Sequence, residues 1–404
     1  MSRPPTRTAI AAGAVALFFL SFLMSASGNA LPQLFLQRQA PQEKAALLSL
    51  ALLASTVAAT VGVLLSRRLR LEQGALLAAL VAVGVLVQAL LAAQTVTAFI
   101  VVLVALQFLV NFLVDQVDHA AVARAGPLLA FGDTVGNAAR LFGMLAAPAY
   151  FPLLAGRVPV ERTGVAVLAL GACVGAWALL RLAPQSTPRA HPDRHEEGRP
   201  QAQDVVVFGF AIAVYAGMYL FAANAIYLLE DLLRIRGAGT RGGALVVTVF
   251  AAAIVANGLA GALDGARTAA KRSVVLLAPA VALAVAAAAP LAGLRPGYAV
   301  CVLACAAIGA GYGFFLRELR RHASAAARAG RGVVLGWFNN MANVSALLAF
   351  ALMLLASRVA PGPGYYVAVL GAIVVLQAAG TLLLGLGSRR GQREVAAPVH
   401  PHAR

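Results

Sequence analysis

Residues 127–150 read PLLAFGDTVGNAARLFGMLAAPAY, a run that is apolar at both ends and polar in the middle. It is long enough to cross a bilayer, because a transmembrane helix needs about 20 mostly apolar residues. The polar groups are an acid, an amide and a guanidinium, at Asp133, Asn137 and Arg140. Offsets of four and seven residues place the three on one helix face. That face must meet protein or water wherever the segment lies in lipid.

The composition of the whole chain indicates that lipid surrounds it. Hydrophobic residues make up 61% of the 404 residues and charged residues only 12%, with a mean hydropathy of +0.83. A soluble domain carries about a quarter of charged residues. The net charge of +17 does not indicate a nucleic-acid partner, because the arginines fall in short runs between apolar stretches, as in membrane proteins. We expect these basic loops to contact anionic lipid headgroups.

Twelve stretches of the chain qualify as transmembrane helices. They cover residues 9–32, 44–65, 73–93, 96–116, 127–150, 163–183, 205–228, 242–263, 273–292, 297–316, 332–357 and 364–387. With the N-terminus inside, the inside connections hold 22 Lys and Arg residues and the outside ones hold nine. This excess predicts that both termini are cytoplasmic, in a multi-pass protein of the inner membrane.

Two matches between distant segments indicate an internal repeat. GNALPQLFL at 28–36 resembles ANAIYLLEDLL at 223–233, which places Asn29 opposite Asn224. DHAAVARAGPLLAFG at 118–132 resembles RHASAAARAGRGVVLG at 321–336, and both matches pair a span with the sixth span after it. The predicted fold is therefore all-α, with 12 transmembrane helices as two pseudo-symmetric six-helix bundles at 1–183 and 205–388. The polar stretch 184–204 is predicted to be a cytoplasmic linker, and 389–404 a cytoplasmic tail.

Six plus six spans and a polar central loop resemble the major facilitator superfamily. The signature of that family, G-x-x-x-D-[RK]-x-G-[RK]-[RK], corresponds here to GVLLSRRLRLEQG at 62–74, where Ser66 replaces the acid and the second glycine is missing. Its counterpart in the second bundle is GLAGALDGARTAAKR at 258–272. The resemblance implies a secondary transporter that rocks two bundles about a central substrate site. The gating loops would contain Arg67, Arg68, Asp264 and Arg267.

Arg140 has the most specific predicted role in the chain. At a rise of 1.5 Å per residue it lies roughly 18 Å into a core about 30 Å thick, and Asp133 lies roughly 8 Å in. A guanidinium at that depth faces a cavity or a partner, and its planar fork suits a carboxylate or phosphate. We therefore predict that Arg140 binds an anionic group of the substrate and that Asp133 exchanges protons. A structural cluster, in which Asn137 bridges the two charges, is the alternative.

Further polar side chains at helical spacing mark other spans that should lie near the cavity. The substrate contacts predicted beside Arg140 are Asn137, Asn29, Asn111, Gln107, Tyr215, Tyr219, Asn224, Asn339 and Asn343. Each such residue taken alone is more often a helix-packing group than a ligand. The glycines of IGAGYG at 308–313 predict close helix packing or a bend.

The predicted function is secondary active transport of a small polar, anionic solute, coupled to protons, with export favoured. An uptake permease of the same fold and siderophore or drug efflux stay as alternatives. So do a sensor and a membrane-embedded enzyme built on Asp115, Asp118 and His119. We expect no enzyme activity, no cofactor and no metal site, because the histidines and cysteines lack ligand spacing. The chain is expected to be a monomer. Its expected partner is the small-molecule substrate.

Overall fold

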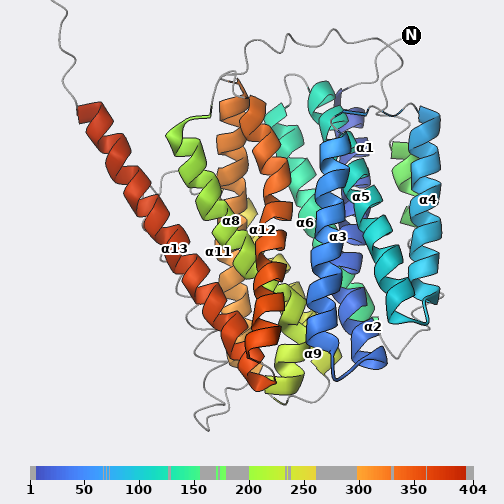
Figure 1. The fold of residues 1–404 in the computed structure, drawn as a ribbon. Helices are drawn as coiled ribbons and strands as arrows, with labels where there is room; N and C mark the ends of the chain where they lie inside the picture. The colour runs from blue at the N-terminus through green and yellow to red at the C-terminus, as the bar shows by residue number, and fades with distance from the viewer. Residues whose placement is uncertain are drawn as a thin grey trace, which may run out of the picture.

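The computed structural model describes residues 6–66, 68–69, 71, 73–125, 129–154, 170–171, 173–178, 200–232, 234, 238–260, 298–328, 332–360 and 362–396, and every regular element in these ranges is a helix. The elements are α1 (Thr6–Ser25), η1 (Ala26–Ala30), α2 (Leu31–Gln39), α3 (Lys44–Ser66), α4 (Gln73–Ala92), α5 (Val96–Ala125), α6 (Leu129–Leu154), α8 (Ala202–Tyr227), η4 (Leu228–Leu232), α9 (Ala238–Ala260), α11 (Tyr298–Arg328), α12 (Gly332–Val359) and α13 (Pro363–Ala396). They stand side by side as a bundle (Figure 1). The predicted window 273–292 lies outside the described residues and 163–183 lies mostly outside them, so the number of spans stays a prediction.

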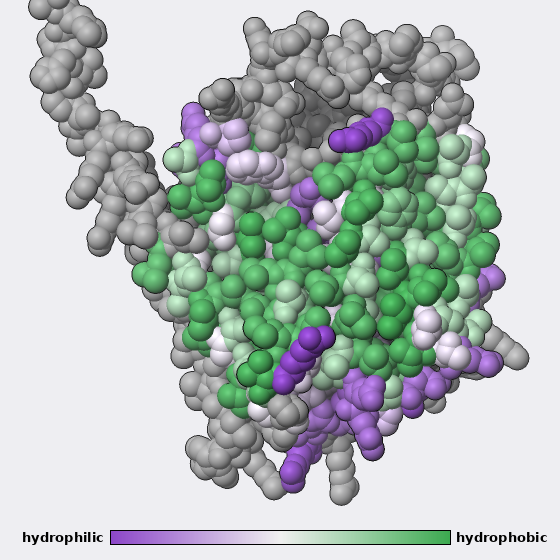
Figure 2. Space-filling view, viewed as in Figure 1, coloured by the Kyte–Doolittle hydropathy of each residue, from purple (hydrophilic) through white to green (hydrophobic). Residues whose placement is uncertain are grey.

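The bundle has the surface of a membrane protein. Within the described residues, six helices are long and apolar enough to cross a bilayer. Large apolar side chains such as Val81, Val101 and Leu355 point outward from them. Figure 2 shows a broad hydrophobic band across the bundle, with hydrophilic residues at its two ends. Lipid is the environment that solvates such a band, as the composition predicts.

The helix that contains the first predicted span runs past the apolar residues and is interrupted by a short π-helical turn. Pro32 stands in the first turn of α2, and its ring lacks an N–H and crowds the carbonyl four residues earlier, at Gly28. The chain accommodates this through the π-helical turn η1, directly before α2. α1, η1 and α2 therefore continue one another and carry polar groups far beyond residue 32, the predicted end of the span.

Three other helices also outrun the predicted windows. α5 has 30 residues and ends at Ala125, α11 has 31 and ends at Arg328, and α13 has 34 and ends at Ala396. The reason is that hydropathy marks where lipid ends, whereas Ala-rich polar segments such as HAAVARA continue a helix into water. The first residues of the predicted C-terminal tail are therefore helical.

Buried apolar side chains form two clusters within the described residues. One is drawn from residues 12–178, and the other from residues 208–373 together with Leu36, Leu48, Leu52 and Leu141. We call residues 6–154 the N-terminal part and residues 202–396 the C-terminal part. The two parts meet where α3 packs against α12 and α6 packs against α9. α3 and α12 lie side by side in the middle of Figure 1.

The glycine run in α11 packs its helix against α9. A Cβ atom added at Gly309 or Gly313 would lie 2.0 Å from the carbonyl oxygen of Val249 or Ala253, respectively. Only the absence of a side chain lets the two backbones approach so closely. Of the two predictions for this run, close packing is the one that the structure shows.

Candidate functional site

A cavity of about 160 Å³ lies between the two parts of the chain. Its walls come from α1, η1, α3, α5 and α6 of the N-terminal part and from α8, α9, α11 and α12 of the C-terminal part. One water needs roughly 10–15 Å³ of such space, so the cavity has room for a small solute. Because helices of both parts form its walls, any motion between the parts changes its shape.

The N-terminal part supplies a polar wall in which amides are linked in series. Gln107 donates from Nε2 to Ser27 Oγ at 2.8 Å, and its Oε1 accepts from Asn111 Nδ2 at 3.0 Å. Both amides are buried and line the cavity, as predicted for substrate contacts. Ser25 lines the same wall and donates to the carbonyl oxygen of Met144 at 3.0 Å, which ties α1 to α6. These bonds fix the orientation of the groups that a solute would meet.

Arg140 lies in this wall, near the middle of α6. The structure places Arg140 in the cavity lining, and its role as the anchor of an anion stays a prediction. The guanidinium is a hydrogen-bond donor at every nitrogen. Asp133 and Asn137 are the two residues predicted beside it. Their side chains lie outside the described residues.

An acidic side chain on α5 also lines the cavity, at a residue that the sequence names only in the alternative enzyme cluster. Asp115 on α5 is buried and accepts a hydrogen bond from Ser66 Oγ at the end of α3. Gln116 closes the same helix end by donating to the carbonyl oxygens of Ser66 and Leu69, each at 2.7 Å. The family signature has an acid where this chain has Ser66. In this chain the acid next to the end of α3 is Asp115, which comes from α5.

The C-terminal part supplies a wall of aromatic rings. Tyr215 lies edge to face with Tyr312, with ring centroids 5.0 Å apart, and Tyr219 lies edge to face with Phe350 at 6.0 Å. All four line the cavity. Asn343 also lines it, and its buried Nδ2 has no hydrogen-bond partner among the described residues. A buried amide donor without a partner costs free energy that a polar solute would recover.

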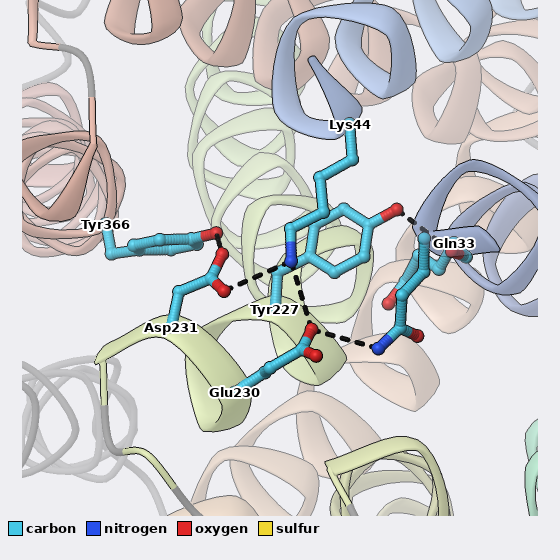
Figure 3. A network of polar contacts seen from close by, with 7 residues as sticks. Gln33, Lys44, Tyr227, Glu230, Asp231 and Tyr366 are labelled. Atoms are coloured by element: carbon cyan, nitrogen blue, oxygen red, sulfur yellow. Dashed lines mark hydrogen bonds and ion pairs between the residues drawn. The ribbon is translucent and has the colours of Figure 1, made fainter. Parts of the chain in front are cut away.

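An ionic network joins the two parts beyond one end of the cavity. Lys44, at the start of α3, places Nζ 3.0 Å from Glu230 Oε2 and 3.1 Å from Asp231 Oδ1, both on η4. Gln37 donates to the same Glu230 oxygen at 2.9 Å, and Tyr366 on α13 donates to Asp231. Figure 3 shows the ammonium group of Lys44 between the two carboxylates. We call these five side chains the Lys44 network.

A second layer connects the Lys44 network to the cavity. The Lys44 ammonium lies 4.7 Å from the ring centroid of Tyr227, whose hydroxyl donates to the carbonyl oxygen of Gln33 at 2.9 Å. Gln33 in turn donates from Nε2 to the carbonyl oxygen of Ala222 at 2.9 Å. Ala222 belongs to the cavity lining. The network therefore lies next to the cavity, at the hairpin between α2 and α3, where it joins the two parts.

The predicted site residues fall into four groups. Inside the cavity lining are Arg140, Gln107, Asn111, Tyr215, Tyr219 and Asn343. Outside the described residues, as side chains or entirely, are Asn29, Asn137, Asp133, Asn339, Arg67, Asp264 and Arg267. Arg68 is described and lies exposed in the turn after α3.

Asn224 is described but occupies another place. It is fully buried, donates from Nδ2 to the carbonyl oxygen of Leu220 at 2.8 Å and accepts from the Tyr365 hydroxyl at 2.8 Å. It is absent from the cavity lining. Its side chain holds α8 against α13, so the predicted substrate contact is corrected to a packing role.

Two observations bear on metal ligands and on the alternative enzyme cluster in the described part of the chain. No group of three metal-ligating side chains occurs there. Of the predicted enzyme cluster, Asp115 is hydrogen-bonded to Ser66, while the side chains of Asp118 and His119 lie outside the description.

Sequence reasoning missed the Lys44 network. The sequence marks Lys44 only as one of the nine basic residues in the outside connections. Glu230 and Asp231 appear only within the repeat match at 223–233. A usable signal existed, because the lysine opens one apolar window and the acids directly follow another on the same predicted side. Their pairing is a matter of tertiary contact that spacing along the chain does not contain.

Comparison with known proteins was made by sequence and by structure. No protein-family model matches the chain, and no curated protein matches it. The structure is similar to a bacterial homolog of the human lysosomal transporter Spinster in its inward-facing, occupied conformation, with a TM-score of 0.65 and 14% identity over 96% of this chain and 98% of the other. The unoccupied inward-facing form of that homolog gives 0.64 and 12% identity over 96% of each chain.

A variant of the nucleoside transporter NupG is also similar, with a TM-score of 0.61 and 14% identity over 93% of this chain and 99% of the other. At such identities a likeness establishes the fold. The chain therefore shares the all-helical fold of these solved transporters.

Proposed function

We propose that this protein is a secondary active transporter that moves a small polar, anionic solute across the inner membrane by alternating access. The observation that carries the proposal is a cavity lined by both parts of the chain and closed at one end by the Lys44 network. The neighbouring solved structures of this fold are transporters, which supports the same class of function.

Arg140 is the proposed anchor for the anion. A guanidinium in the polar wall of the cavity provides a bidentate, charge-assisted site for a carboxylate or phosphate. Gln107, Asn111 and Asn343 provide neutral hydrogen bonds around it. A solute held in this way contacts both parts of the chain at once, so its binding free energy can depend on how the parts are oriented.

Asp115 is the proposed site of proton exchange within the described residues, beside the earlier candidate Asp133. It is a buried carboxyl in the cavity wall, where gain or loss of a proton changes the charge that the solute meets. The excess of basic residues in the connections favours a cytoplasmic position for both termini. With the termini in the cytoplasm, the Lys44 network closes the outer end of the bundle, and the solute reaches the cavity from the cytoplasmic side.

Reconstitution into vesicles tests the proposal directly. Purified protein should exchange a labelled organic anion across the membrane without a partner subunit or nucleotide, and an imposed proton gradient should drive its accumulation. Export is the direction expected. Arg140→Gln should abolish the exchange, whereas the exposed Arg358→Gln should not change it.

Failure of the purified chain to move any member of a panel of carboxylates, phosphates and sulfonates would refute the anion-transport proposal. The panel is informative only if the protein remains folded, so size-exclusion behaviour and thermal unfolding are recorded for each variant. Exchange that survives in Arg140→Gln would remove the anchor role.

A further inference from the structure

We infer that the solute is an organic anion with a planar aromatic body, held with its charge against the N-terminal part and its ring against the C-terminal part. This inference rests on the proposed function and names its substrate class. The observation behind it is the unequal division of side-chain chemistry between the two cavity walls.

The aromatic side chains all stand on one wall. Among the cavity residues that the structure describes, Tyr215, Tyr219, Phe250, Tyr312, Phe338 and Phe350 come from the C-terminal part, and the N-terminal part contributes no ring. The pairs Tyr215–Tyr312 and Tyr219–Phe350 already meet edge to face. Rings arranged in this way leave faces and edges for a further ring, and aromatic pairs add stabilisation beyond the area that they bury.

The charged side chains all stand on the opposite wall. Arg140 and Asp115 are the charged residues of the described lining, and both belong to the N-terminal part. The amides Gln107 and Asn111 and the hydroxyls of Ser21, Ser25, Ser55 and Thr56 accompany them. On the aromatic wall, Asn343 is the one amide among the described residues.

The two walls together select a solute with two unlike ends. A small hydrophilic anion would leave the aromatic wall against water, and a neutral ring would make no charge-assisted hydrogen bond to the guanidinium of Arg140. A ring that bears a carboxylate satisfies both walls at once. Asp115, on the same wall as Arg140, accepts a hydrogen bond from Ser66 at the end of α3.

Four probe compounds separate the contributions of charge and ring. They are naphthoate, its saturated counterpart decalin carboxylate, the neutral naphthalenemethanol, and acetate. Binding is measured by titration calorimetry on the full chain in lipid nanodiscs, without any requirement for transport. Naphthoate should bind about tenfold more tightly than each of the other three, since it alone meets both walls.

Substitutions then assign each contribution to its wall. Arg140→Gln should weaken naphthoate to the level of naphthalenemethanol and leave naphthalenemethanol unchanged. Phe350→Leu and Tyr219→Leu keep apolar volume while removing a ring, so they should weaken naphthoate and naphthalenemethanol severalfold and leave acetate unchanged. The matched controls Arg358→Gln and Phe142→Leu change exposed residues outside the lining and should alter nothing.

Equal binding of naphthoate and decalin carboxylate would overturn the aromatic part of the inference, and equal binding of naphthoate and naphthalenemethanol would overturn the anionic part. The proposed function fails in a different way. If naphthoate binds with this selectivity but vesicles show no exchange, transport is refuted and the ligand class stands. If vesicles exchange acetate as well as naphthoate, transport stands and the ligand class is refuted.

Discussion

Lys44 and Glu230 lie 186 residues apart in the chain, yet their charged groups meet at 3.0 Å and join the N-terminal part to the C-terminal part. The Lys44 side chain is largely buried. The Glu230 side chain is more than a third exposed, and the Asp231 side chain is about a third exposed. The contact therefore has one protected partner and two partly hydrated ones. We call this contact the latch, because breaking it would not leave a carboxylate in an apolar core.

Lys44→Gln should open the end of the bundle that the Lys44 network closes. Hydrogen bonds to charged groups contribute about 1.5–3 kcal/mol, and partial exposure of the acids reduces this value, so the population should shift roughly five- to thirtyfold toward the open form. The measurement is labelling of Thr56→Cys, a cavity residue, by a membrane-impermeant maleimide added on the Lys44 side. Cys173, Cys301 and Cys305 are first replaced by alanine.

The matched control for this latch is Arg38→Gln, which removes an exposed charge from neighbouring α2. It should leave the labelling rate unchanged. The exchanged pair Lys44→Glu with Glu230→Lys should restore slow labelling in part, because the opposite charges again face one another. Equal labelling in all of these variants would show that the latch does not hold the two parts together.

Asn224 and Asn343, both predicted as substrate contacts, should respond differently to alanine. Asn224→Ala removes a partner from the buried Tyr365 hydroxyl, so the free energy of unfolding should fall by about 1–3 kcal/mol without a change in solute affinity. Asn343→Ala should reduce affinity about three- to tenfold with little change in stability, because its Nδ2 has no partner among the described residues. Thermal unfolding and solute binding on the same samples give both readings, and the reverse pattern would contradict the assignment.

Asp115→Asn should uncouple transport from the proton gradient. The amide keeps an oxygen that accepts from Ser66 but cannot gain or lose a proton near neutral pH. Exchange of labelled for unlabelled solute should therefore persist, while accumulation driven by the gradient should be lost. Gradient-driven accumulation at the original rate would exclude Asp115 as the coupling group and leave Asp133 as the candidate.

Gly313→Ala should destabilise the packing of α11 against α9. The new methyl group would meet the carbonyl oxygen of Ala253 at 2.0 Å, and such overpacking costs about 1–3 kcal/mol. Gly371→Ala on α13 is the control, because a Cβ there meets nothing within 4 Å. That control should be neutral or stabilise the helix by up to about 1 kcal/mol. Equal unfolding temperatures for the two variants would show that α9 and α11 adjust freely.

Much of the fold follows from hydropathy alone. Runs such as 44–65 and 96–116 must lie in lipid, since no soluble surface could be made from so few charges, and the structure has helices there. Hydropathy does not register where a helix stops, so α5, α11 and α13 run past their windows. It does not register a change of helix geometry either, and the π-helical turn before Pro32 was not foreseen.

The sequence by itself determined that this is an all-helical membrane protein and that Arg140 must avoid lipid, because the transfer of charge and apolar surface depends on residue type and local period. Only the tertiary structure decided which polar residues share a cavity. It placed Asn343 in that lining and Asn224 in a packing contact, and it paired Lys44 with Glu230 across the bundle. The physical reason is that a side chain's partner on another helix is set by how helices pack and rotate, and local spacing carries no record of that rotation.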